Sequence, residues 1–210
     1  QPVATGRIAL LSPTQAWLEG LRVDPNYRGR GYARQMHDFT VAAAVAIPGV
    51  ERVGLATSWE NEAVRHMSLA SGMHQVGDFY YTVAPAADND APELNVFGPQ
   101  DFAAVRARVD GSECARLAGG HMANGWQFPV LTDALLDRLL REGRVVGYAR
   151  AGQPVVLALL GQNKERADVW IGFLAGDGET AVGDLARALR GRALGLPDAR
   201  ARAMLPAGLT

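Results

Sequence analysis

The chain has 210 residues, of which 48% are hydrophobic and 20% charged, and its 21 basic and 22 acidic residues give a net charge of -1. This composition is typical of a folded globular protein and excludes a disordered chain, while the near-neutral charge argues against nucleic-acid or membrane binding over the whole surface. The single cysteine excludes an internal disulfide and favours a cytoplasmic location, and the sequence shows neither an apolar run of membrane-spanning length nor the pattern of a signal peptide.

Strand and helix patterns alternate along the first part of the chain. Short apolar runs bounded by turn formers predict strands, and apolar residues at i, i+3 and i+7 predict helices. The expected elements, in order, are strands at 7–11 and 17–23, a helix at 32–46, a strand at 50–59, a helix at 61–70 and a strand at 78–83. In the second strand, strict alternation would place Trp17, Glu19, Leu21 and Val23 on one face.

A stretch rich in proline and turn formers, residues 85–92, is the best candidate for a domain boundary. It divides the chain into expected domains at 1–84 and 93–210. The second of these predicts strands at 94–97, 145–150, 155–160, 169–174 and 201–205, and helices at 99–109, 133–142 and 179–194. Strands and helices that alternate in this way predict an α/β fold with mixed sheets covered by helices.

The most informative stretch, residues 23–33, follows a strand and opens a helix. Gly29 and Gly31 leave backbone N–H groups accessible there, and the positive end of the helix dipole favours an anion. The local net charge is +3, from Arg22, Arg28, Arg30 and Arg34 against Asp24. These features predict a diphosphate-binding loop, and the alternative is a flexible, solvated surface turn. The loop is neither a Walker loop nor the Gly-x-Gly-x-x-Gly dinucleotide fingerprint.

Two motifs in this part resemble the GCN5-related N-acetyltransferase (GNAT) superfamily. The first is Arg28-Gly29-Arg30-Gly31-Tyr32-Ala33, which matches the family's Arg/Gln-x-x-Gly-x-Gly/Ala turn at a helix start, after a strand that ends in valine. The second begins about thirty residues further on, with Asn61 after the next strand and a helix that ends in Gly72-Met73, where the family has Gly-Phe. The resemblance covers Arg7 to about Tyr81.

The resemblance implies a GNAT-like fold and acetyl-CoA as co-substrate. The end of the second strand would separate from its neighbour and pair its backbone with the pantetheine arm, the loop would wrap the pyrophosphate, and Asn61 would hydrogen-bond the cofactor. The implied cofactor-binding residues are Leu21, Arg22, Val23, Arg28, Gly29, Arg30, Gly31, Tyr32, Ala33, Arg34 and Asn61. The acetyl group would pass directly from the thioester to an amine through a tetrahedral intermediate, which needs a base, an oxyanion donor and a proton for the leaving thiolate.

The residue at the expected position of the general acid departs from the family pattern. Family members often place a tyrosine seven residues after the asparagine, and this chain has Ser68 there. A serine hydroxyl is a poor acid, so Ser68 would hydrogen-bond the sulfur directly or act through a water molecule. Tyr32, Tyr80 and Tyr81 are the alternatives, and nothing in the sequence places any of them at the site.

Glu19 is the candidate catalytic base. It lies in the strand beside the expected cofactor, a region where members of the family often carry a catalytic carboxylate. A face shared with Leu21 and Val23 would partly desolvate the carboxylate and make it a stronger base. The alternative is an ion pair between Glu19 and a neighbouring arginine, such as Arg22 or Arg7, because ion-pair networks also perturb carboxylates.

The start of the chain is a second departure from the family. The family domain normally begins with a strand, two helices and another strand, which form much of the acceptor site. Here the chain opens on Gln1, inside sequence that already looks structured, and one strand precedes the motif strand. We therefore expect the N-terminal elements to be missing, so that the acceptor half is either absent or supplied by another segment.

Residues 144–206 weakly resemble a second copy of the same fold. The equivalent loop, residues 175–180, keeps its glycines but has no arginine, and Asp177 and Glu179 stand where the pyrophosphate would lie. Carboxylates at a helix start satisfy the helix dipole and repel a phosphate. We therefore predict two GNAT-like copies in tandem, of which the second is degenerate, does not bind CoA, and serves a structural role or walls the acceptor cleft.

The sequence thus predicts an N-acetyltransferase that moves an acetyl group from acetyl-CoA to a primary amine of a small molecule or peptide. The alternatives are a non-catalytic acyl-CoA-binding or regulatory module, and a structural protein whose Gly/Arg turn is incidental. We expect no metal site, because the four histidines lack ligand-like spacing with cysteine or carboxylates. We expect no nucleic-acid or membrane partner, and a homodimer stays open.

Overall fold

The computed structural model describes residues 2–88, 90–162, 168–176 and 179–209. The chain divides into two compact units, Gln1–Gln75 and Val76–Thr210, which we call unit 1 and unit 2. This division falls before the boundary expected at residues 85–92. The reason is that the strand expected at 78–83 pairs within the sheet of unit 2, so it does not close a domain at residues 1–84.

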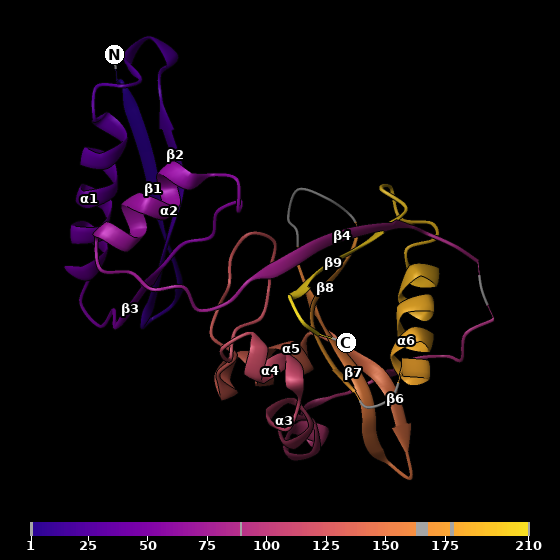
Figure 1. Cartoon of the computed structure of the whole chain (residues 1–210). Coiled ribbons are helices and arrows are strands. Elements are labelled where there is room, and N and C mark those ends of the chain that lie inside the picture. Colours follow the sequence, from indigo (N-terminus) through magenta and orange to yellow (C-terminus); the bar gives the residue numbers. More distant parts are fainter. Residues whose placement is uncertain (1, 89, 163–167, 177–178, 210) are drawn as a thin grey trace. The chain divides into compact units, whose positions relative to one another are not determined.

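Unit 1 is a three-stranded mixed sheet with α1 along one face (Figure 1). Its elements are β1 (Ala4–Ser12), β2 (Gln15–Val23), the 3-10 helix η1 (Pro25–Tyr27), α1 (Tyr32–Val45), β3 (Arg52–Gly54) and α2 (Glu62–Ala70). The strand order is β1-β2-β3, in which β1 and β2 are antiparallel and β2 and β3 are parallel. Both predicted helices and the first two predicted strands are confirmed, and these two strands are longer than expected.

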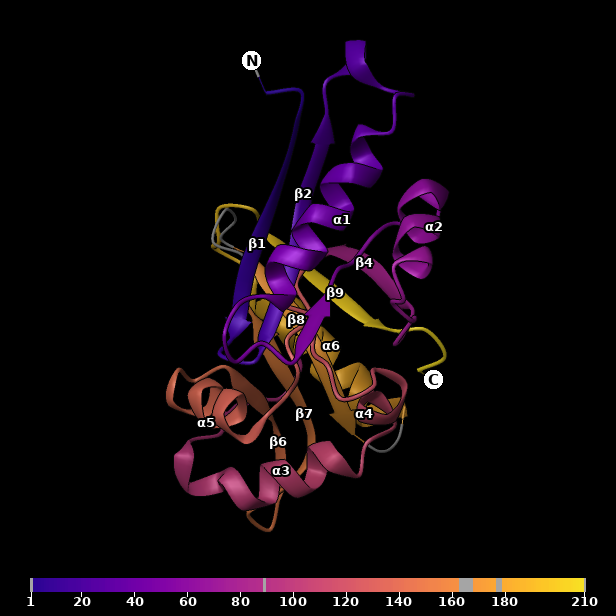
Figure 2. The same cartoon turned by 90° about the vertical axis from the view of Figure 1, so that its left-hand side faces the viewer.

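The β1–β2 hairpin and α1 form the core of unit 1, and Figure 2 shows α1 running alongside the hairpin. Ser12 pairs with Gln15, which leaves a two-residue turn where the sequence predicted one. Apolar side chains of the strands and the helix meet in a cluster centred on Ala16, Leu18 and Ala44. The sheet and α1 are therefore fixed to one another around the start of β2.

The pairing between β2 and β3 is short. It runs only from Gln15↔Arg52 to Trp17↔Gly54. The last position needs a glycine because a Cβ on Gly54 would come 2.8 Å from the ring of Trp17. The strand expected over 50–59 is therefore corrected to β3, since the chain leaves the sheet after Gly54. From that point β2 continues without a partner on this side.

A β-bulge interrupts the alternation of β2. Two of its residues, Gly20 and Leu21, lie opposite a single residue of β1. Gly20 has φ +67°, a left-handed conformation that favours glycine. The extra residue reverses which side chains share a face, so Glu19 lies on the same face as Arg22 and not as Val23. The single face expected for alternate residues from Trp17 to Val23 is therefore wrong.

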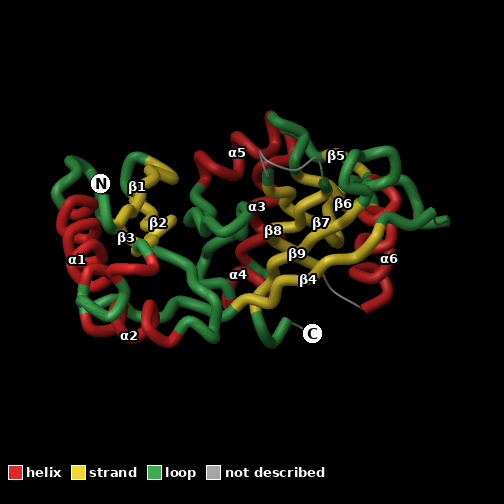
Figure 3. The backbone as a smooth tube through the Cα atoms, turned by 90° about the horizontal axis from the view of Figure 1, so that it is seen from above, coloured by secondary structure: helices red, strands yellow, loops and turns green. Residues whose placement is uncertain are grey.

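Unit 2 contains a six-stranded mixed sheet of order β4-β9-β8-β7-β6-β5 (Figure 3). Its strands are β4 (Phe79–Pro85), β5 (Asn95–Val96), β6 (Val145–Arg150), β7 (Gln153–Gly161), β8 (Val169–Gly176) and β9 (Arg200–Pro206). Its helices are η2 (Pro99–Asp101), α3 (Phe102–Asp110), α4 (Glu113–Leu117), α5 (Asp133–Arg141) and α6 (Glu179–Arg192). The sequence predicted these elements except α4, which is too short for a periodic pattern.

Helices cover both faces of this sheet, with α3, α4 and α5 on one face and α6 on the other (Figures 1 and 3). The first core includes the fully buried Leu139 and Phe173, and the second includes Leu185 and Leu189. Cys114 is part of the first core, where burial raises the pKa of its thiol to about 11. The thiol is therefore protonated near neutral pH, so it is a poor nucleophile.

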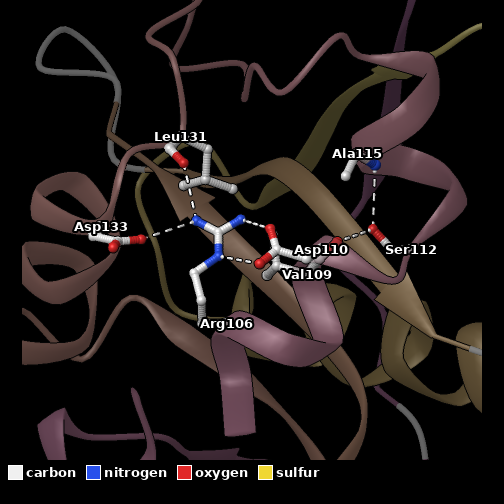
Figure 4. Close-up of polar contacts among 7 residues, drawn as sticks. All are labelled: Arg106, Val109, Asp110, Ser112, Ala115, Leu131 and Asp133. Atoms are coloured by element: carbon white, nitrogen blue, oxygen red, sulfur yellow. Dashed lines mark hydrogen bonds and ion pairs between the residues drawn. The ribbon is translucent and has the colours of Figure 1, made fainter. Parts of the chain in front are cut away.

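Arg106 of α3 joins three segments of unit 2 (Figure 4). Its guanidinium forms an ion pair with Asp110, one turn further along the same helix. It also donates a hydrogen bond of 3.0 Å to the carbonyl oxygen of Leu131, and its Nη1 atom lies 3.8 Å from Oδ1 of Asp133, the first residue of α5. The side chain is only 19% exposed, so this contact fixes α3 against the start of α5 more firmly than a solvated pair would.

A buried ion-pair cluster surrounds Arg202 of β9. Its guanidinium pairs with the carboxylates of Asp168 and Asp198 and donates to the hydroxyl oxygen of Tyr81 at 2.6 Å. The side chains of Arg202 and Asp168 are 4% and 0% exposed. Asp198, followed by Asp168, raises the pKa of Arg202 above its ordinary value. The ring of Tyr81 stacks on Trp170 with centroids 5.8 Å apart, so β4, β8 and β9 meet at this cluster.

The two units repeat one arrangement of strands and helix. In unit 1 the β1–β2 hairpin is followed by α1 and by β3, which pairs in parallel with β2. In unit 2 the β7–β8 hairpin is followed by α6 and by β9, which pairs in parallel with β8 over residues 169–171. The strand–strand–helix–strand order expected in both parts of the chain is confirmed.

We predict that replacing Arg202 with Met lowers the free energy of unfolding of unit 2 by about 3–5 kcal/mol, because it removes the ion-pair partner of the fully buried Asp168 carboxylate. Arg200 on the same strand provides a matched control. Its side chain is 53% exposed, and Arg200→Met is expected to cost at most about 1 kcal/mol. Urea denaturation of both variants measures the two effects. Equal losses would contradict the importance of the buried cluster.

Candidate functional site

The turn between β2 and α1 has a defined backbone. Asp24 accepts a hydrogen bond of 2.9 Å from the backbone N–H of Asn26, which caps η1. Gly29 and Gly31 have φ +75° and +80°, and Gly31 is the N-cap residue of α1. A side chain other than glycine would strain these left-handed positions by roughly 1–2 kcal/mol each. The two glycines of the predicted loop are therefore required by its conformation.

The backbone of this turn is rich in free donors. The N–H groups from Gly29 to Arg34 have no hydrogen-bond acceptor within the part of the chain that the structure describes. The next N–H group along the helix, that of Gln35, donates a hydrogen bond of 3.1 Å to the carbonyl oxygen of Gly31. A run of unused N–H groups at the positive end of a 14-residue helix can accept an anionic group.

Arginine side chains surround these donors. The Nε of Arg28 donates to the carbonyl oxygen of Val23 at 3.4 Å, and the guanidinium of Arg30 lies 5.4 Å from the centre of the Tyr27 ring. Arg34 forms an ion pair of 2.9 Å with Asp38, one turn further along α1. Arg28 and Arg30 therefore keep guanidinium N–H groups for a ligand, while Arg34 is partly neutralised by its own helix.

A cleft of about 200 Å³ lies where β2 and β3 part. Its walls come from β1, the free stretch of β2, α1, the segment after β3 and the start of α2. The lining residues are Gly6, Arg7, Leu18, Glu19, Gly20, Leu21, Arg22, His37, Thr40, Leu55, Ala56, Thr57, Asn61 and Val64. The cleft therefore runs beside backbone groups of β2 that no neighbouring strand pairs on that side.

The structure brings some of the predicted site residues to this cleft and leaves others outside it. Glu19, Leu21, Arg22 and Asn61 line the cleft. Val23 and the residues from Arg28 to Arg34 lie just beyond it, at the end of β2 and the start of α1. The cleft and the donor-rich turn are thus consecutive along β2, as one extended ligand would require.

Glu19 is held by an ion pair. Its carboxylate lies 2.6 Å from the Nε of Arg7 across the β1–β2 hairpin, and its side chain is 26% exposed. This is the pairing that the sequence left open as the alternative to a catalytic base. An exposed pair of this kind contributes at most about 1 kcal/mol, so it orients the carboxylate toward the cleft without locking it.

The side chains of Ser68 and Asn61 both form hydrogen bonds with the backbone of α2. The hydroxyl of Ser68 donates to the carbonyl oxygen of Val64 at 2.8 Å, and Ser68 is not among the described residues that line the cleft. Asn61 is the N-cap residue, and its side-chain oxygen accepts from the N–H of Val64 at 3.3 Å. The Asn61 side-chain amide therefore faces the cleft with its donor group unused, whereas the Ser68 hydroxyl is already engaged.

His37 is a residue of the cleft that sequence reasoning missed. It is 3% exposed, and its Nε2 atom lies 3.0 Å from the hydroxyl oxygen of Ser71. Burial lowers the pKa of its imidazole, with Asp38 acting to raise it and Arg34 to lower it. The sequence signal that indicates its burial is its position, because a histidine three residues before Thr40 falls on the apolar face of the helix.

Two further findings concern other classes of site. Among the described residues, no group of three or more His, Cys, Asp and Glu side chains could hold a metal ion, and no helix is long and apolar enough to cross a membrane. In unit 2, the predicted repulsive carboxylates fall where the structure gives no description, since Asp177 and the side chain of Glu179 lie outside the described residues.

Residues 1–72 match the model of the acetyltransferase (GNAT) family, a class of acyltransferase enzymes. The match covers nearly all of unit 1 and none of unit 2. No curated protein sequence matches the chain significantly. The family match falls on the unit that holds the turn and the cleft.

The fold is similar to that of solved acetyltransferase structures. These include a GCN5-related N-acetyltransferase from Sphaerobacter thermophilus, with a TM-score of 0.59 and 15% identity, and a candidate acetyltransferase from Thermoplasma acidophilum, with a TM-score of 0.55 and 14% identity. The alignments cover 98% of this chain and 68% and 66% of those chains, so this chain spans about two thirds of their length. At these identities the likeness shows a mixed α/β, GNAT-like fold.

The lowered pKa of His37 predicts that unit 1 loses stability in acid. Unfolded His37 binds a proton near its ordinary pKa of 6.5 and folded His37 binds it less readily, so stability is complete above that pH and falls as the pH drops below it. His37→Gln is expected to remove this slope, and the exposed His66→Gln on α2 to keep it. Urea denaturation between pH 5 and 8 tests the prediction, and an unchanged slope in His37→Gln would contradict it.

Proposed function

We propose that unit 1 binds acetyl-CoA and that the protein transfers the acetyl group to a primary amine of a small molecule or peptide. The observation that carries this proposal is the continuity of two features, a turn of unused N–H groups and a cleft beside the free stretch of β2. The family match of residues 1–72 supports the same activity.

The turn fits the diphosphate of a CoA molecule. The donors from Gly29 to Arg34 converge at the start of α1, and Arg28 and Arg30 add positive charge beside them. A Cβ placed on Gly29 or Gly31 would meet no protein atom within 4 Å, so the space over the turn is open. Bidentate arginine contacts and helix N-termini are the usual partners of phosphate groups, so these residues would hold the anionic end of the ligand.

The cleft fits an extended arm that carries amides and a thioester. β2 ends its pairing with β3 at Trp17, so the stretch from Leu18 to Val23 does not pair with β3 on that edge. An extended ligand can use such an edge as an added strand would. The side-chain amide of Asn61 stands at the same cleft with its donor available. These residues would bind and orient the arm between the diphosphate and the acyl group.

Bound acetyl-CoA supplies the activated acetyl group, and the chain supplies groups for the amine. Glu19 lines the cleft as a carboxylate oriented by Arg7, so it can hold an incoming ammonium group by charge and accept a proton from it. Backbone N–H groups along the bulge of β2 are candidates for stabilising the developing oxyanion. Ser68 is the weaker of our two catalytic candidates, because its hydroxyl bonds to the Val64 carbonyl.

A non-catalytic acyl-CoA-binding module is the second candidate function. It is favoured by the engagement of both proposed catalytic groups, Glu19 with Arg7 and Ser68 with Val64. Incubation with acetyl-CoA and a panel of amines distinguishes the two. Release of CoA that depends on an amine supports the enzyme, and tight binding without turnover on any amine in a longer chain supports the module.

The role proposed for unit 2 is that of a second, degenerate GNAT-like copy. The support is the repeated order of hairpin, helix and parallel strand, which pairs β8 with β9 as β2 pairs with β3. The family model does not match this unit, as expected of a diverged copy. We propose that it does not bind CoA and that its role is structural.

We predict that Gly31→Ala weakens the binding of acetyl-CoA by about tenfold, because the left-handed position resists a Cβ and the new methyl group enters the space over the donors. Gly195 is the matched control, since it has the same φ of +80°, is equally open and lies in unit 2. Gly195→Ala is expected to leave affinity unchanged. Isothermal titration calorimetry measures both. Equal affinities for the wild type and Gly31→Ala, or no binding by the wild type, would contradict the proposal.

A further inference from the structure

His37 brings a polar ring into the wall of the cleft from the side of α1. Its side chain is almost completely buried, with the residue 3% exposed, and it lines the cleft together with Thr40 of the next helical turn. Gly6 of β1 allows the helix to lie close, because a Cβ on it would be 3.2 Å from Thr40 Cγ2. A buried imidazole has to satisfy both ring nitrogens, so each one can be accounted for.

The hydrogen bonds of the ring determine which nitrogen carries the proton. Ser71, the C-cap residue of α2, donates its hydroxyl proton to the carbonyl oxygen of Ser68 at 2.8 Å. A hydroxyl has only one proton, and Ser71 has already donated its own. The Ser71 oxygen, 3.0 Å from His37 Nε2, can therefore only accept a hydrogen bond from the ring. Nε2 therefore carries the hydrogen and Nδ1 is an unprotonated acceptor. Nδ1 has no partner within the described chain.

Burial disfavours the charged form of the ring, and the charges around it largely balance one another. Burial lowers the pKa of His37, and on α1 itself Arg34 and Asp38 oppose one another as an ion pair. The charged groups that face the cleft from the other elements are Arg7 of β1 and Glu19 and Arg22 of β2. Arg7 and Glu19 form an ion pair and offset one another, and Arg22 adds a positive charge, so the net charge facing the ring is not negative. A neutral ring at the wall of the cleft therefore offers Nδ1 as an acceptor to a donor of a bound ligand.

We propose that His37 Nδ1 accepts a hydrogen bond from an amide N–H of the pantetheine arm, which makes His37 a cofactor-positioning residue. The inference rests on the proposed function. His37 lies five residues along α1 from Tyr32, about 7.5 Å at the helical rise per residue. The arm places its first amide at a similar separation from the diphosphate, whereas the diphosphate and the thioester carry no N–H to donate. The secondary hydroxyl of the arm lies nearer to the diphosphate, so the first amide is the donor that matches the separation of His37.

Two substitutions separate this role from the structural link to Ser71. His37→Gln places its amide nitrogen near Nε2, so it keeps a donor for Ser71 and loses the acceptor at Nδ1. His37→Asn places its oxygen near Nδ1, so it keeps the acceptor and loses the link. We expect His37→Gln to bind CoA about tenfold more weakly with an unchanged melting temperature. We expect His37→Asn to melt earlier and keep its affinity. His66→Gln is the control for an exposed histidine.

Calorimetric titration with CoA at pH 5 to 8 is the experiment. The affinity of the wild type is expected to fall below pH 6.5, as Nδ1 becomes protonated and can no longer accept, and that of His37→Gln to stay level. In the wild type, the Nδ1 signal in a long-range ¹H–¹⁵N spectrum is expected to shift when CoA is added, an effect that no purely structural role would produce.

The outcomes discriminate between the proposals. CoA binding by the wild type that His37→Gln leaves unchanged, with a silent Nδ1 signal, overturns this inference and leaves the proposed function standing. No binding of CoA by the wild type overturns both. Unchanged CoA affinity with a loss of turnover alone assigns the Nδ1 contact to the acceptor amine and also overturns the inference.

Discussion

The site in unit 1 depends on how few residues join β2 to β3. A parallel pair held over only three positions, ending where Trp17 covers Gly54, leaves the rest of β2 without a partner on one side. The cleft exists because the chain after β3 turns away, and the bulge at Gly20 sets which side chains of β2 face it. Both features are local departures from regular pairing, and each requires a glycine. The donor-rich turn follows at the end of the same strand, so one strand would position both parts of the proposed ligand.

The anion-binding turn could be predicted in detail from the sequence because its chemistry is local. Glycines with positive φ, a helix start and a cluster of arginines lie within a dozen residues, and the structure places Gly29 and Gly31 in left-handed conformations. Unit 2 was predicted almost as well at the level of its elements, since its strands are long apolar runs. The boundary between the two units was predicted less well. Whether β4 pairs with β3 or with β9 depends on the tertiary structure, and no local sequence pattern encodes it.

The cleft was predicted less well for the same reason. A single extra residue in β2 changed the face of Glu19 relative to Val23, and the register that reveals it is set by the partner strand. The ion pair between Arg7 and Glu19 was foreseen as an alternative, whereas the burial of His37 and its contact with Ser71 depend on the packing of α1 against α2. The polar groups of the wall thus come from elements that are distant in sequence, and their combination defines how a ligand would be held.

Hydrogen–deuterium exchange with and without CoA tests the central claim most directly. The amides from Gly29 to Arg34 have no acceptor in the described chain, so they should exchange fast in the free protein and become protected when CoA is added, together with the stretch from Leu18 to Val23. The segment at β8 and β9 of unit 2 should not change. Protection confined to unit 2, or none at the turn at saturating CoA, would contradict the assignment of the cofactor to this turn and cleft.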